Sequence, residues 1–239
     1  MSGSRHRSFR SRLLSFFLLK LPLAFVTFTV LWVLVLRWVP VVATPLMVKR
    51  AIEYRSDGDF HTQYRWRSLS KISPEMAKAV IASEDNRFME HDGFDRVEIR
   101  KAIDDHRNKG KKLRGASTIS QQTAKNVFCL PSRSFTRKAF EAYFTILIEK
   151  IWGKERIMEV YLNVAEMGKG VYGAEAAARH WFGHSAAELT RRESCLIAVS
   201  LPSPLKSNPA KPSSYISGRA SVIASRESQL SYPEWITKH

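Results

Sequence analysis

The longest apolar run of the chain lies near its N-terminus. The run from Leu13 to Leu36 holds 24 residues, and Lys20 is the one charged side chain among them. A helix needs about 20 apolar residues to cross the core of a bilayer, and a lysine near one end can extend its ammonium to the lipid surface. The pattern therefore predicts a membrane-spanning helix within residues 13–40.

After this run, apolar residues recur at helical spacing, and no segment alternates polar and apolar positions convincingly. Ser73 followed by Pro74 is typical of a helix start, with Met76, Ala79 and Val80 along one face. Further helices are predicted over residues 136–152, 154–167, 173–183 and 185–201, the last opened by a capping box of Ser185 and Glu188. We therefore expect an all-α fold.

The stretch RGASTISQQTAKNVF, residues 114–128, departs from this helical pattern. A core helix needs apolar residues at positions i, i+3, i+4 and i+7, and here Ala116, Ile119 and Ala124 alone could serve. We therefore expect an exposed loop or the wall of a polar cleft, and not a core helix.

The chain carries a large excess of basic residues. The formal net charge is +16, from 38 basic and 22 acidic residues, and residues 1–50 hold eight Lys or Arg and no Asp or Glu. Such an excess indicates an anionic partner, whether nucleic acid, a phosphorylated substrate or an acidic membrane surface. Arg5, Arg7, Arg10 and Arg12 precede the apolar run, so the positive-inside rule places the N-terminus in the cytoplasm.

These patterns predict a simple domain organisation. The predicted parts are a cytoplasmic tail (1–12), a transmembrane anchor (13–40), a linker (41–64) and one folded domain (65–239). The alternative to an anchor is a signal peptide cut after Ala43, because Val41-Val42-Ala43 offers small residues to a peptidase. Under either interpretation the folded domain lies outside the cytoplasm.

Two cysteines, Cys129 and Cys195, leave two interpretations open. They could form a disulfide in an oxidising compartment, or they could be separate buried thiols. The sequence holds neither a CxxC pair nor His-rich spacing, so we expect no protein metal site.

Three polar clusters stand out from the helical background: ASEDNRFMEHDGF (82–94), the stretch 114–128, and SRSFTRKAFE (132–141). Each cluster alone is typical of a solvated helix end. In order and spacing, however, the three together resemble the signature motifs of glycosyltransferase family 51, the peptidoglycan glycosyltransferases that polymerise lipid II. The resemblance covers residues 65–210.

The signature motifs of the family have counterparts in this chain. The family's Glu-Asp-x-x-Phe-x-x-His-x-Gly corresponds to Glu84, Asp85, Phe88, His91 and Gly93. Its Gly-x-Ser-Thr-Ile-Thr-Gln-Gln-x-x-Lys-Asn corresponds to Gly115 through Asn126, with Ser120 in place of a threonine. Its Arg-Lys-x-x-Glu corresponds to Arg137, Lys138 and Glu141, and its later helix motifs resemble KERIMEVYLN and GVYGAEAAARHWFG.

The resemblance implies a role for each of these residues. Glu84 would be the base that activates the acceptor hydroxyl, and Glu141 would be a second carboxylate that orients a basic side chain, a water or a cation. The departing diphosphate would be held by Lys125, Arg133, Arg137 and Lys138. Neutral hydrogen bonds to sugars and phosphates would come from Ser117, Thr118, Gln121, Gln122 and Asn126. The implied fold is a lysozyme-like helical domain of two lobes with a groove between them.

The resemblance also implies partners and a location. The partners would be lipid II, the nascent glycan and proteins of cell division or wall synthesis, with no nucleic acid. The protein would be a single-pass protein of the bacterial inner membrane with a periplasmic catalytic domain. It would have no transpeptidase activity, since no such domain follows in the sequence. A divalent cation on the diphosphate, Mg²⁺ or Mn²⁺, stays an open alternative.

Two other classes of protein fit part of the pattern. A lysozyme-like hydrolase or lytic transglycosylase would share a helical fold and an essential glutamate, but it has no use for a diphosphate-binding set of cations. A non-catalytic scaffold that binds anionic polymer would explain the charge alone. It would leave four polar residues unexplained: Glu84, Gln121, Gln122 and Glu141.

Overall fold

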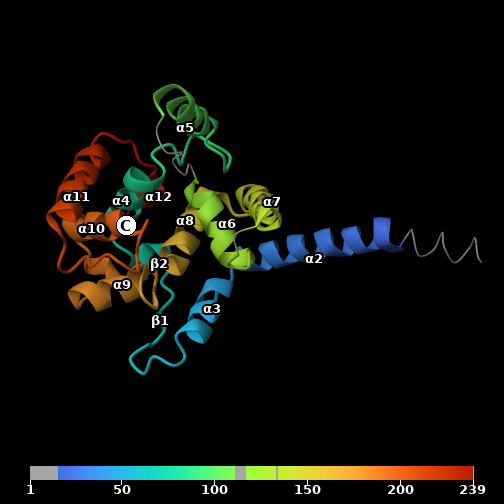
Figure 1. Cartoon of the computed structure of the whole chain (residues 1–239), viewed down its shortest axis with the longest axis horizontal. Helices are drawn as coiled ribbons and strands as arrows, with labels where there is room; N and C mark the ends of the chain where they lie inside the picture. The colour runs from blue at the N-terminus through green and yellow to red at the C-terminus, as the bar shows by residue number, and fades with distance from the viewer. Residues whose placement is uncertain (1–15, 111–116, 133, 239) are drawn as a thin grey trace, which may run out of the picture. The chain divides into compact units, whose positions relative to one another are not determined.

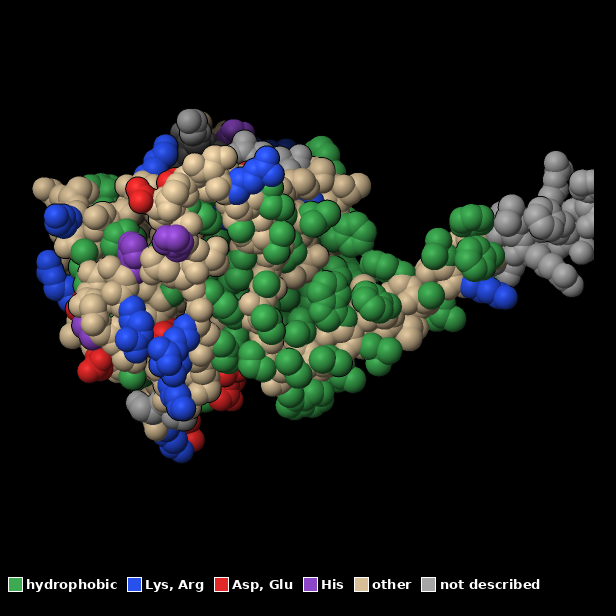
Figure 2. All heavy atoms as spheres, turned by 90° about the horizontal axis from the view of Figure 1, so that it is seen from below, with side chains coloured by type: hydrophobic (Ala, Val, Ile, Leu, Met, Phe, Trp, Pro, Cys, Tyr) green, Lys and Arg blue, Asp and Glu red, His purple; other side chains and the backbone are tan. Residues whose placement is uncertain are grey.

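The computed structural model describes residues 16–110, 117–132 and 134–238. Contacts along the chain define two compact units, Met1–Val39 and Pro40–His239. In the first unit a π-helical turn, Phe16–Lys20, continues into α2, Leu21–Leu36. Hydrophobic side chains cover the length of α2 (Figure 2). Among the residues described, this 21-residue segment is the one helix long and apolar enough to cross a membrane.

The second unit is built mainly of helices, as predicted (Figure 1). Its helices are α3 (Pro45–Glu53), α4 (Pro74–Glu84), α5 (Arg96–Lys109), α6 (Ile119–Phe128), α7 (Phe135–Ile151), α8 (Gly153–Val164), α9 (Gly173–Phe182), α10 (Arg191–Ser200), α11 (Ser214–Glu227) and α12 (Glu234–Thr237). Short 3₁₀ turns cover Leu69–Lys71 and Ala186–Glu188.

A small sheet, which the sequence pattern did not reveal, completes this unit. Its strands are β1 (Gln63–Tyr64), β2 (Glu166–Gly168) and β3 (Val171–Tyr172), in the order β1-β3-β2. β1 runs parallel to β3, and β2 runs antiparallel to it. Residues 41–64, expected as a linker, therefore contain α3 and β1 and belong to the compact unit. Strands of two or three residues are too short to produce a visible alternation.

Two groups of helices form the core. α4, α10 and α11 pack on one another, and α6 packs on α7 and α8 (Figure 1). The predicted apolar face of α4 is buried through Met76, Ala79 and Val80. In the second group the rings of Phe128 and Phe144 stack, with centroids 4.4 Å apart.

The helix predicted over residues 185–201 is divided in two. The capping box of Ser185 and Glu188 is present, but it closes only the 3₁₀ turn Ala186–Glu188. The backbone then becomes extended at Thr190, and a second capping box, Thr190 with Glu193, begins α10. Since each box satisfies the free N–H groups of its own first turn, the two together stabilise a break.

The two cysteines are unpaired and buried, so the disulfide interpretation is not supported. Burial raises the pKa of Cys129 to about 11 and that of Cys195 to about 12. Both thiols therefore stay protonated at neutral pH and behave as small apolar side chains.

Candidate active site

Glu84 is the last residue of α4, and its carboxylate faces α6. The Gln122 side-chain amide donates a hydrogen bond to Glu84 Oε2 at 2.9 Å. The Tyr161 hydroxyl of α8 donates in turn to Gln122 Oε1 at 3.4 Å. Burial raises the pKa of Tyr161 well above its ordinary value, and the charges of Glu84 and Asp85 raise it further. The phenol therefore stays a donor, and it orients Gln122 toward the carboxylate. Glu84 itself is only partly buried.

The next residue, Asp85, is buried and has a different task. Its Oδ2 accepts a hydrogen bond from the backbone N–H of Ile119 at 3.0 Å, and its Oδ1 lies 2.9 Å from His91 Nε2. The N–H of Gly93 donates to His91 Nδ1 at 3.1 Å, so Nδ1 must be the accepting nitrogen and Nε2 must carry the proton. Asp85 and His91 thus tie the loop after α4 to the start of α6.

Asp85, His91 and Asp95 also form a cluster with metal-ligand chemistry, since one atom of each lies within 4.8 Å of the others. Both ring nitrogens of His91 are already engaged in hydrogen bonds. Asp95 accepts from the N–H groups of Val97 and Glu98 and so caps α5. The cluster is therefore explained by the fold, and its histidine has no lone pair left for a metal.

Most of the polar stretch forms a largely buried helix, α6, so the expectation of an exposed loop and not a core helix is wrong, although one face of the helix stays accessible. Ile119, Ala124 and Val127 are buried toward the core. Buried polar side chains of the helix find partners: the Thr123 hydroxyl donates to the carbonyl of Ile119 at 2.9 Å, and Ser120 donates to Glu149. Because such groups are satisfied within the protein, a helix with few apolar residues can lie in the interior.

Two predicted substrate-binding residues are used by the fold at the start of α6. The N–H of Gln121 donates to the Thr118 hydroxyl, and the Gln121 side chain accepts from the N–H of Thr118, both at 3.1 Å. The Thr118 hydroxyl also donates to the carbonyl of Gly93 at 2.7 Å. Both side chains are buried, so the structure gives them a capping role.

Three other predicted residues remain accessible along α6. Gln122 and Asn126 are half-buried and Lys125 is exposed. Their spacing of three and four residues places them on one face of the helix. Ser117, just before the helix, is also exposed.

Lys125 of α6 and two cations of α7, Arg137 and Lys138, form a cluster around Glu141. The carboxylate of Glu141 is buried, and it accepts from Arg137 Nη1 at 2.6 Å and from Lys138 Nζ. Partial desolvation lowers the pKa of Lys125; the charge of Glu141 opposes this shift, and those of Arg137 and Lys138 add to it. One carboxylate thus sits among three cations, which leaves positive charge to receive an anion.

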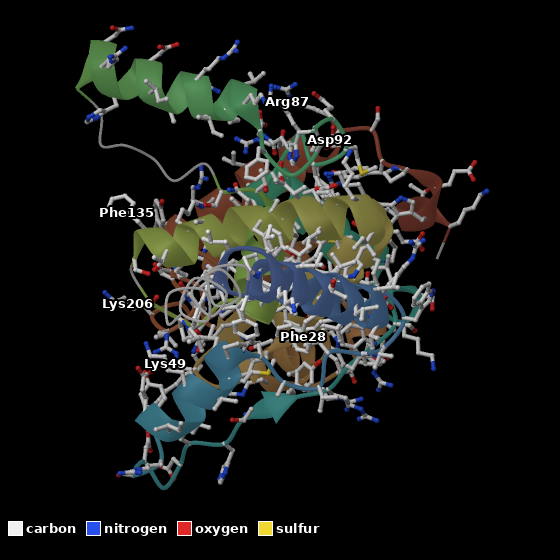
Figure 3. All side chains as sticks on the ribbon, turned by 90° about the vertical axis from the view of Figure 1, so that its right-hand side faces the viewer. Phe28, Lys49, Arg87, Asp92, Phe135 and Lys206 are labelled. Atoms are coloured by element: carbon white, nitrogen blue, oxygen red, sulfur yellow. The ribbon has the colours of Figure 1, made fainter. Side chains whose placement is uncertain are left out.

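The cluster lies at the N-terminal end of α7, where Phe135 is 97% exposed (Figure 3). Two further residues matched to the family motifs, Arg133 and Gly115, lie outside the described residues. Tyr161 was missed by sequence reasoning, because its place on the buried face of α8 gives no sign that its hydroxyl reaches Gln122 across the fold.

Comparison with known proteins shows the family to which the chain belongs. Residues 52–227 match the family model described as Transglycosylase. The chain is 56% identical over 196 residues to the biosynthetic peptidoglycan transglycosylase of Bacteroides thetaiotaomicron, which covers 82% of this chain and 79% of that protein. It is 51% identical over 215 residues to the protein of the same name from Caulobacter vibrioides, covering 90% of this chain and 91% of the relative.

A third relative of that name, from Pseudomonas putida, is 47% identical over 213 residues and covers 89% and 90% of the two chains. The family model alone spans most of the folded unit, including the helices that carry all three polar clusters. The chain therefore belongs to the transglycosylase family, the glycosyltransferases that build the glycan strands of peptidoglycan.

Proposed function

We propose that Glu84 is the general base of lipid II polymerisation and that the cations around Glu141 hold the diphosphate that departs. The observation that carries this proposal is the accessible face of α6. Gln122 contacts Glu84 at one end of that face, and Lys125 lies one turn further on, within the field of Glu141. Because α6 contacts the base through Gln122 and carries Lys125 of the anion site, this one rigid helix fixes the distance between the acceptor hydroxyl and the leaving group.

The proposed reaction is a single displacement. Glu84 takes the proton of the acceptor sugar's 4-hydroxyl as that oxygen attacks the anomeric carbon of the growing chain. The bond from this carbon to the diphosphate oxygen breaks, and its electron pair leaves with the diphosphate. Lys125, Arg137 and Lys138 stabilise the charge that develops there. The configuration inverts, and no covalent glycosyl-enzyme forms.

A divalent cation on the diphosphate stays a separate proposal. Mg²⁺ and Mn²⁺ prefer oxygen ligands, and Glu141 is the carboxylate of this cluster that could supply them. Both of its oxygens already accept hydrogen bonds from Arg137 and Lys138. The described residues of this cluster therefore suit direct binding of the diphosphate by Lys and Arg side chains. They suit less well a metal ion that the protein holds against the diphosphate.

The apolar helix of the first unit is the basis for a proposed location of the protein. We propose a single-pass inner-membrane protein with its folded unit in the periplasm, where lipid-linked sugar donors are consumed. The apolar helix within Phe16–Leu36 supports the anchor, and the arginines before it support the orientation.

The test is polymerisation of labelled lipid II by the purified full-length protein, with and without a chelator. Glu84→Gln is nearly isosteric, so it should lower turnover at least about a hundredfold, as loss of a general base does, while the melting temperature stays unchanged. Glu90→Gln is the matched control, because Glu90 lies in the loop that follows Glu84 and is exposed beside Arg87. Retained turnover in Glu84→Gln would place the base elsewhere, and cleavage of finished glycan without lipid II would indicate a lytic enzyme.

A further inference from the structure

A buried ion pair lies behind the candidate site, where α7 ends and α8 begins. Lys154 Nζ is 2.7 Å from Glu149 Oε1, and the two side chains are 15% and 7% exposed. Lys154 is in the first turn of α8, and Glu149 is in the last turn of α7. The proposed reaction uses neither residue, and an ion pair this buried needs an explanation, because desolvation often costs as much as the pairing returns.

The pair makes contacts to the loop that follows Glu84. Lys154 Nζ also donates to the backbone carbonyl of His91 at 2.6 Å. The same ammonium lies 4.6 Å from the centre of the Phe88 ring, a cation–π contact with a fully buried aromatic side chain. The α-carbon of Gly93 sits so close to α7 that an added Cβ would lie 3.0 Å from Glu149 Cγ. The loop over residues 88–93 is therefore held down on the α7–α8 junction.

The pair also contacts α6. The Ser120 hydroxyl donates to Glu149 Oε1, the same oxygen that receives Lys154. Ser120 lies two residues before Gln122, the partner of Glu84. One carboxylate oxygen thus joins the helix that carries Gln122 to the lysine that holds the loop of Glu84.

We propose that Glu149 and Lys154 are positioning residues for the reaction: they fix the loop after Glu84 and the first turn of α6 in one geometry, so that Gln122 meets the Glu84 carboxylate. This inference rests on the proposed role of Glu84. The hydrogen bonds of the pair are directional, whereas apolar side chains of the same volume would fill the space without fixing either segment.

The first test separates positioning from stability. Lys154→Met keeps the length of the side chain and removes its charge and donors, and Glu149→Gln neutralises the partner. Lys154→Met should lower kcat on lipid II by tenfold to about a hundredfold, the range expected when a reacting group is misplaced by about 1 Å, with little change in KM. It should also lower the melting temperature, because Glu149 is left buried and unpaired.

The double variant is the decisive one. Glu149→Gln with Lys154→Met leaves no unpaired buried charge, so the melting temperature should recover while kcat stays low. A kcat that recovers together with the melting temperature would show that the pair only stabilises the fold, and would overturn the proposal. Arg50→Met is the matched control: Arg50 pairs with Glu166 at 3.2 Å, with side chains 21% and 7% exposed, and its loss should lower the melting temperature without a comparable fall in kcat.

A second test asks whether the pair acts through Gln122. Gln122→Ala and Lys154→Met should not be additive, because each releases the same contact between Gln122 and Glu84. Additive losses in kcat would overturn the positioning role and leave the proposed function intact. Full turnover of Glu84→Gln, in contrast, would refute the proposed function itself, so the two failures can be told apart.

Discussion

At the scale of single residues, the two adjacent glutamines of α6 show how one motif serves two purposes. Successive residues of a helix point about 100° apart, so Gln121 and Gln122 face different surroundings. Gln121 is buried in the capping box with Thr118, whereas Gln122 is half-exposed and donates to Glu84. The resemblance implies that both bind substrate, whereas the structure shows that Gln121 caps α6 and that Gln122 contacts Glu84.

Alanine substitution of the two glutamines should therefore give opposite results. Gln121→Ala removes a capping interaction, so it should reduce the free energy of unfolding by about 1 kcal/mol and leave turnover of the folded protein nearly unchanged. Gln122→Ala should leave the melting temperature nearly unchanged and lower turnover about tenfold, since the Glu84 carboxylate loses the donor that orients it. Thermal unfolding in detergent measures stability, and lipid II kinetics measure turnover. Equal effects of the two variants on both quantities would contradict separate roles for the two glutamines.

At the scale of elements, the sequence predicted the helices that bury an apolar face. α4 starts at Pro74 after Ser73, as expected, although the Ser73 side chain makes no capping hydrogen bond. α6 was missed because its burial depends on satisfied polar groups, which a hydrophobic pattern cannot detect. A signal did exist: Thr118 and Gln121 have the spacing of a capping box.

The candidate site was predictable only in part. The resemblance named Glu84, Lys125 and Glu141, but no local pattern connects Glu84 to Gln122, 38 residues later. The contacts of Tyr161 and Lys154 also join distant segments, so they are fixed by packing and not by periodicity. Sequence reasoning thus predicted which residues carry the chemistry, and the packing of α6 against α7 and α8 determines how they lie relative to one another.

The close packing of the loop after α4 against α7 can be tested at Gly93. Gly93 and Gly153 both have positive φ, 89° and 77°, so alanine is strained at either position. A Cβ on Gly93 would lie 2.6 Å from Thr145 Cγ2, whereas a Cβ on Gly153 would meet nothing within 4 Å. Gly93→Ala should therefore lower both the melting temperature and turnover clearly more than Gly153→Ala. Equal losses of melting temperature and turnover in the two variants would mean that backbone strain alone causes them, and that the loop is not closely packed against α7.

α9 is tied to the rest of the unit by a buried carboxylate with an unusual pKa. Glu175 accepts from Arg67 Nη2 at 3.0 Å, from Arg179 Nε at 2.7 Å and from the N–H of Ala186 at 3.0 Å. Burial opposes its ionisation, but these hydrogen bonds outweigh burial and lower the pKa of Glu175 from 4.5 to about 2. The folded state therefore binds the Glu175 proton more weakly than the unfolded state does.

A depressed pKa stabilises the fold above the unfolded value of 4.5, and this contribution is lost as the pH falls toward 2. Glu175→Gln should thus be less stable than the native protein at pH 7, by about 2 kcal/mol or a few degrees in melting temperature. The difference should shrink between pH 5 and pH 2. Melting curves of both proteins across this range provide the test, and a difference independent of pH would assign the loss to packing instead of charge.

At the scale of the whole molecule, the two units suit a substrate that is itself part of a membrane. A lipid-linked sugar is confined to the bilayer surface, so an enzyme tethered to the same surface meets it at a higher effective concentration. The basic excess agrees with this setting, because half of the net charge of +16 comes from residues 1–50. Anionic headgroups are a partner of the chemistry that such a basic segment attracts.

The anchor gives the final prediction: the protein stays uncleaved, with its N-terminus inside and its C-terminus outside. The apolar run is directly preceded by Arg5, Arg7, Arg10 and Arg12. On its other side Lys49 and Arg50 lie further away, in the middle of α3. A C-terminal reporter that is active only outside the cytoplasm should therefore give signal, and the same reporter on the N-terminus should give none. Mass measurement completes the test: a mature chain that begins at Thr44 would show that the apolar helix is a signal peptide, and that the folded unit reaches its lipid substrate without this anchor.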